Sequence, residues 1–183
     1  MKQECDKIGV VFLNCASWKH PKHPEIEFFG CTLWSLMSKR TWSQMNENKV
    51  FENHQNLLSL HLQHVQWLTE SLKESKATQK YGITHYLPSF DLVHPRFASS
   101  TINDGFATNL NNILDNKNLN LKGWFYGHSH ERVCKIIIGT LPSYNNPMGY
   151  PKEVRLTEIS YDAIPFELGV LKETEDTPKK VKS

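Results

Sequence analysis

The chain contains short apolar runs separated by polar and turn-forming residues. Runs of strand type occupy residues 9–14, 26–33, 81–86 and 121–126. Two more runs, 133–138 and 141–144, flank Gly139-Thr140, which predicts a strand pair joined by a tight turn. Residues 18–24 contain two prolines. They predict a turn or loop, because proline disfavours helix at the residue before it.

Longer segments show the helical period. Asn53 is a candidate cap for a helix that runs to about Lys76, and its apolar positions share one face: Leu58, His61, Leu62, Val65, Leu68 and Leu72. A second helix is expected over residues 102–114. Strands that alternate with helices predict an α/β fold, in which the chemistry sits on loops just past the carboxyl ends of the strands.

Composition narrows the class of protein. The chain has 183 residues, 39% of them hydrophobic and 22% charged, and a net charge of +2, so one globular domain is expected over residues 1–171. The tail, residues 172–183, is charged and poor in apolar residues, and we expect it to be disordered. The small net charge gives no reason to expect nucleic acid or a membrane surface as a partner.

Localisation follows from what the sequence does not contain. It has no apolar stretch long enough to cross a membrane and no signal-peptide pattern near Met1, so a cytoplasmic protein is expected. The four cysteines form no C-x-x-C pair and are interpreted as free thiols in a reducing compartment.

The candidate chemistry is carried by histidines at two strand ends. His85 ends the run 81–86, and Gly127-His128-Ser129-His130 follows the run 121–126. Neutral imidazole is a common ligand for transition metals, so the three histidines are candidate metal ligands. Either motif alone occurs often by chance. The interpretation depends on their combination, with a helix between them.

The order Thr84-His85-x-x-Pro88-Ser89, then Gly127-His128-Ser129-His130, resembles the calcineurin-like metallophosphoesterases. Further segments resemble one branch of that family: 29–35, 94–97, 103–110 and 146–151. The resemblance covers residues 9–150.

The resemblance implies a β-sandwich flanked by helices, with two divalent metal ions (manganese, iron or zinc) at a site that hydrolyses small-molecule phosphoesters. It makes His85 and His128 ligands of one ion and His130 a ligand of the other. It also places His94, Arg96 and Asn146 near the substrate. Tyr86 stands where many relatives have a second histidine.

Three acidic motifs of the family are not present: D-x-H, G-D-x-x-D or -N, and G-N-H-D or -E. We therefore interpret the chain as the C-terminal portion of such a domain, without its bridging carboxylate. Neutral histidines cannot balance two divalent ions, so at most one ion, weakly held, and little activity of the chain alone are expected.

The missing segment has a structural consequence as well. Without it the strand 81–86 should become a sheet edge, which favours self-association or pairing with a partner fragment. Two alternatives remain open. One is a degenerate, non-enzymatic domain that binds a partner or one metal ion, and the other is a structural domain in which the histidines have no function.

Two other groups of histidines have simpler interpretations. His61 lies on an apolar helix face and is interpreted as a packed core residue. His20 and His23 lie among prolines and lysines and are interpreted as part of a solvated loop.

Overall fold

The computed structural model describes residues 1–131, 136–145, 147 and 149–150; for 136–138 the backbone alone is described. Its strands are β1 (Ala16–His20), β2 (His23–Cys31), β3 (Gln79–Thr84), β4 (Leu121–Phe125), β5 (Ile136–Ile138) and β6 (Leu141–Tyr144). Its α-helices are α1 (Lys2–Lys7), α2 (Lys39–Trp42), α3 (His54–Glu74) and α4 (Asn111–Leu114). Short 3₁₀ turns occupy Asn46–Lys49, Phe90–Leu92, Pro95–Phe97, Asn103–Gly105 and Lys117–Leu119.

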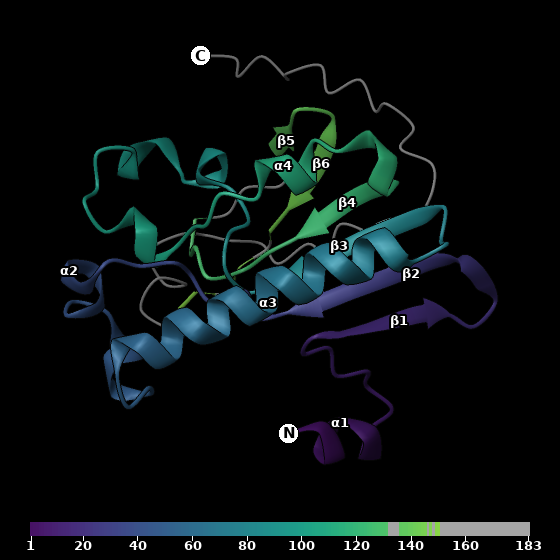
Figure 1. Ribbon diagram of the computed structural model, residues 1–183, viewed down its shortest axis with the longest axis horizontal. Helices are drawn as coiled ribbons and strands as arrows, with labels where there is room; N and C mark the ends of the chain where they lie inside the picture. Colours follow the sequence, from purple (N-terminus) through teal and green to yellow (C-terminus); the bar gives the residue numbers. More distant parts are fainter. Residues whose placement is uncertain (132–135, 146, 148, 151–183) are drawn as a thin grey trace, which may run out of the picture.

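Within these described residues, the strands form one mixed sheet in the order β1-β2-β3-β4-β6-β5 (Figure 1). Strands β2, β3, β4 and β6 run parallel, whereas β1 and β5 pair antiparallel at the two edges. This arrangement confirms the α/β class. The second sheet of a sandwich is not seen in the described part of the chain.

Strand β3 lies between β2 and β4, so the expectation that residues 81–86 form a sheet edge was wrong. The parallel neighbours come from within this chain. Residues 26–31 pair with residues 79–84, and residues 80–83 pair with residues 121–125. The edges among the described strands are β1 and β5. Self-association, or pairing with a partner, through a sheet edge stays a prediction, and β1 and β5 are the described strands that would form the contact.

Helix α3 lies across one face of the sheet (Figure 1). Asn53 caps it, accepting a hydrogen bond from the Asn56 amide as the sequence predicted. Leu68 and Leu72 are fully buried and pack into one cluster with Phe29, Cys31 and Trp124. Among the described helices, none has the length and apolar character needed to cross a bilayer.

Three local predictions were wrong. Residues 9–14 form no strand, and Val10 and Val11 are each about half exposed, because no neighbouring strand pairs with them. For residues 18–24 the turn is present, at Pro21-Lys22, but the residues on either side of it belong to the paired strands β1 and β2 and not to a loop. Residues 102–114 form a 3₁₀ turn (Asn103–Gly105) and the short helix α4 instead of one helix, because Ala107 between them pairs with Leu87 in a β-bridge.

Two buried histidines of α3 hold the loop that follows β2. His64 Nδ1 accepts a hydrogen bond from the Leu33 amide at 3.1 Å, and His61 Nδ1 donates to the Trp34 carbonyl oxygen. Leu33 itself is in the left-handed region, with φ of 54°. The prediction that His61 is a core residue is confirmed, since it is 4% exposed. The two rings thus pair with the Leu33 amide and the Trp34 carbonyl group, which lie in a loop outside any helix or strand.

Burial lowers the pKa of both rings, and the unfolding free energy should therefore fall as the pH drops below about 6.5, the pKa of an unfolded histidine. The reason is that the unfolded chain binds protons which the buried rings resist. Urea unfolding at pH 7.5, 6.5 and 5.5 measures this slope. His64→Asn keeps an acceptor near the Leu33 amide but cannot titrate, so its slope should be shallower. A variant slope equal to that of the original chain would contradict this explanation.

Candidate metal centre

The two histidine motifs meet at the carboxyl ends of β3 and β4. His85 Nε2 lies 3.1 Å from His128 Nδ1, and the ring centroids are 5.0 Å apart at an interplanar angle of 72°. The residues are 43 positions apart in sequence, and the parallel pairing of β3 with β4 brings them together. Carboxyl ends of adjacent parallel strands are where an α/β sheet usually carries its ligands.

Backbone hydrogen bonds fix the two segments against each other. The Gly127 amide donates to the His85 carbonyl oxygen at 3.0 Å, and the His85 and Tyr86 amides both donate to the Thr32 carbonyl oxygen. A Cβ added at Gly127 would lie 3.2 Å from His85 Nδ1, so a glycine there allows the close approach.

A second chain of hydrogen bonds links the core to this turn. Trp124 Nε1 donates to Thr84 Oγ1 at 3.0 Å, and Thr84 Oγ1 donates to the Tyr86 carbonyl oxygen at 2.8 Å. The indole of Trp124 is fully buried. The position of His85, between Thr84 and Tyr86, is therefore set by the sheet itself and not only by a mobile loop.

His128 has an unusual backbone and environment. Its φ is 61°, in the left-handed region that a residue with a side chain seldom adopts. Its ring stacks on Tyr86, with centroids 4.1 Å apart, and lies against Phe106. Burial, together with the charges of His85 and His130, lowers the pKa of His128 to about 4, so the ring is neutral near pH 7 and able to act as a ligand.

His128 also has a polar atom whose hydrogen bonding is incomplete. Its Nε2 is buried and meets no partner at full hydrogen-bond geometry in the described part of the chain, although a backbone contact with Gly105 acts to raise the pKa of the ring. Buried polar atoms are rarely left unpaired, and functional sites are among the exceptions. His128 therefore combines a strained backbone with a buried nitrogen whose hydrogen bonding is incomplete, and both features are typical of functional sites.

His130 lies near this pair without joining it. It is exposed and its ring contacts Tyr150 edge-on, with centroids 4.6 Å apart. Its charge lowers the pKa of both His85 and His128. Within the described ranges, no three side chains of histidine, cysteine, aspartate or glutamate lie close enough together to hold a metal ion. The described geometry therefore brings together two of the three predicted ligands.

The candidate substrate contacts His94 and Arg96 make different interactions in the structure. His94 Nδ1 accepts a hydrogen bond from the Arg96 amide at 3.3 Å and caps a 3₁₀ turn. Arg96 forms an ion pair with Glu131, and its guanidinium lies 4.4 Å from the Phe97 ring centroid. Asn146 lies outside the described residues.

A pocket of about 420 Å³ opens beside the histidine pair. It is formed by the ends of the three central parallel strands and by one residue of the N-terminal segment. Its lining is Leu13, Cys31, Thr32, Ile83, Thr84, His85, Phe125, Tyr126 and Gly127. A small ligand in this pocket would reach His85 directly.

Sequence reasoning missed one residue of the site. Glu47, from the 3₁₀ turn Asn46–Lys49, is only 8% exposed and accepts a hydrogen bond from the Tyr86 hydroxyl. Its segment is polar and surface-like, so nothing in the local pattern marks a buried carboxylate.

Comparisons of the chain with protein-family models, with curated proteins and with solved structures found no match.

Proposed function

We propose that the His85–His128 pair binds one divalent metal ion and that the chain contains part of a phosphoesterase-type metal site. The separation of 3.1 Å between His85 Nε2 and His128 Nδ1 carries this proposal. Two imidazoles bound about 2.0–2.1 Å from one ion, at the angles of tetrahedral or octahedral geometry, have nitrogens about 2.8–3.4 Å apart. The pair therefore needs almost no rearrangement of this distance to accept an ion.

Phosphoester hydrolysis is the reaction class that this proposal favours. A bound divalent ion lowers the pKa of a coordinated water and neutralises charge on a phosphoryl group. The chain's own contribution is to hold two imidazoles together at the strand ends, where His85 lines a pocket of about 420 Å³ in which a phosphoester would lie. The sequence motifs given above support the same class, and His130 is the candidate for a second ion.

The expected rate of phosphoester hydrolysis depends on how many metal ions the site holds. The sequence contains none of the three acidic motifs that would bridge two ions. With one weakly held ion and no bridging carboxylate, a nucleophile between two ions cannot form.

Hydrolysis of bis-p-nitrophenyl phosphate with manganese should therefore be barely above that of a His128→Ala control. Rapid turnover that is lost in His128→Ala would overturn the prediction of low activity and would indicate a complete enzyme. The same assay should be repeated with zinc and iron(II), because the histidine ligands suit all three metals.

A second candidate function is a degenerate domain that binds a metal ion or a partner without catalysis. The absence of a three-ligand group within the described residues favours it. It predicts ion binding that depends on His128 and no hydrolysis with any of the three metals.

A further inference from the structure

The histidine pair is joined to a buried carboxylate through a tyrosine. The Tyr86 ring stacks on His128, with centroids 4.1 Å apart and 29° between the planes, and meets His85 edge-on at 5.4 Å. Its hydroxyl donates a hydrogen bond to Glu47 Oε1. Tyr86 is 1% exposed, so a single rigid side chain contacts both candidate ligands and the carboxylate.

The Tyr86 hydroxyl is the donor of this hydrogen bond and Glu47 Oε1 is the acceptor. The contact fixes one carboxylate oxygen of Glu47 against the ring that packs on His128.

A buried carboxylate is costly unless a positive charge lies near it. Within the described ranges no lysine or arginine forms an ion pair with Glu47. The carboxylate is hydrogen-bonded to the hydroxyl of the ring that stacks on His128 and meets His85 edge-on. Its charge therefore lies one tyrosine ring away from both candidate ligands.

We propose that Glu47 is the positioning and charge-balancing residue of this site: held by Tyr86, its carboxylate favours a divalent cation on the His85–His128 pair. This inference rests on the proposed function. It also changes the electrostatic expectation from sequence, because the site contains a negative charge that the missing acidic motifs did not supply. Glu47 acts through Tyr86 and through its field, and not as a ligand.

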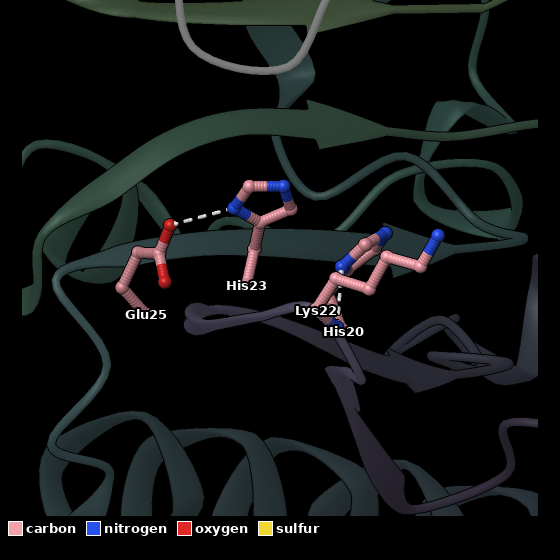
Figure 2. A network of polar contacts seen from close by, with 4 residues as sticks. All are labelled: His20, Lys22, His23 and Glu25. Carbon is pink, nitrogen blue, oxygen red and sulfur yellow. Dashed lines mark hydrogen bonds and ion pairs between the residues drawn. The ribbon is translucent and has the colours of Figure 1, made fainter.

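The test measures zinc affinity by competition with a fluorescent chelator, in a background where His20→Asn and His23→Asn remove a competing site. These two histidines lie at the exposed hairpin turn, with ring centroids 5.0 Å apart and Glu25 beside His23 (Figure 2). Two neighbouring imidazoles at the surface are candidate metal ligands themselves, so the substitutions keep them from competing for zinc.

Three variants separate charge from shape. Glu47→Gln keeps the shape but removes the charge, and zinc binding should weaken about tenfold, the lower end of the effect of residues that support metal ligands. Glu47→Asp keeps the charge but shortens the side chain, and should bind more tightly than Glu47→Gln. Glu27→Gln is the matched control. Glu27 lies on β2, is 5% exposed and accepts hydrogen bonds from Ser17 and Ser75. It is a buried carboxylate that is not hydrogen-bonded to Tyr86, so its replacement should not change zinc affinity.

The outcomes distinguish this inference from the proposed function. If zinc binding is lost in His128→Ala but unchanged in Glu47→Gln, the role of Glu47 is overturned and the metal site stands. If Glu47→Asp binds more weakly than Glu47→Gln, shape matters instead of charge, which also overturns it. If the protein does not bind zinc, or His128→Ala binds normally, the proposed function fails and this inference fails with it. Should Glu47→Gln not fold, Glu47→Asp against the original chain decides: an affinity within about threefold supports the role of the charge, and a larger loss overturns it.

Discussion

Replacement of His128 by alanine should weaken the binding of a divalent transition metal by at least about 100-fold. The variant removes one of two nitrogens that lie 3.1 Å apart, and a single remaining imidazole at an exposed strand end holds an ion poorly. Cobalt(II) titration followed by visible absorption measures both the affinity and the ligand field. The His20→Asn, His23→Asn background again removes the exposed hairpin pair.

Two controls make this result specific. His94→Ala removes a histidine outside the pair, whose ring caps a 3₁₀ turn, and should leave cobalt affinity unchanged. Circular dichroism should show that His128→Ala is folded. Alanine has a Cβ as histidine has, so the substitution does not change the backbone strain of the left-handed conformation at residue 128. Equal cobalt affinity in the His128→Ala variant and the original chain would remove the basis of the metal site.

Replacement of Gly82 by alanine should destabilise the fold by about 3 kcal/mol, at the upper end of the usual cost of overpacking. Gly82 lies on the central strand β3, and a Cβ there would come within 2.3–2.6 Å of three atoms of the Trp124 indole. The indole is fully buried and donates its hydrogen bond to Thr84, so it has little room to move. Urea unfolding at pH 7.5 measures the change.

Gly123→Ala is the matched control for this prediction. Gly123 lies on the neighbouring strand β4, and its added Cβ would meet the Tyr81 ring at 3.3–3.4 Å, a contact that a small shift relieves. Its cost should be smaller by about 2 kcal/mol, the difference between a hard clash and a tight contact. A Trp124→Leu change in the Gly82→Ala background should recover part of the loss, because the two side chains compete for one space. Additive effects of Gly82→Ala and Trp124→Leu would contradict this packing explanation.

The sequence predicted those parts of the fold in which local and tertiary signals agree. Asn53 and the helical period that includes Leu68 and Leu72 indicated α3. The predicted apolar face was only partly right, because Leu62 is 59% exposed while Leu57 and His64 are buried. The residues 102–114 show the same period over a shorter stretch. There the β-bridge between Ala107 and Leu87 sets the backbone conformation. A helical period in the sequence contains no information about a bridge partner 20 residues away.

The candidate site shows the same division. His85 and His128 were identified as candidates because their motifs lie at the ends of two predicted strands. The structure pairs these strands in parallel and brings the two nitrogens together. Glu47 could not be identified, because its burial depends on the contact between its 3₁₀ turn and Tyr86, 39 residues away. The hairpin of β1 and β2 was missed for a different reason: Pro21 suits a turn, but the flanking residues 18–20 and 23–24 are strand residues despite their polarity.

The most direct test concerns the two facing nitrogens, which are either a ligand pair or simply a hydrogen-bonded pair. Zinc titration followed by long-range ¹⁵N–¹H NMR of the imidazoles reports on each nitrogen separately. We expect His85 Nε2 and His128 Nδ1 to shift together and to saturate at one equivalent of zinc, before His20 and His23 respond. If both nitrogens kept their metal-free shifts at saturating zinc while the hairpin histidines moved, the metal site would be contradicted.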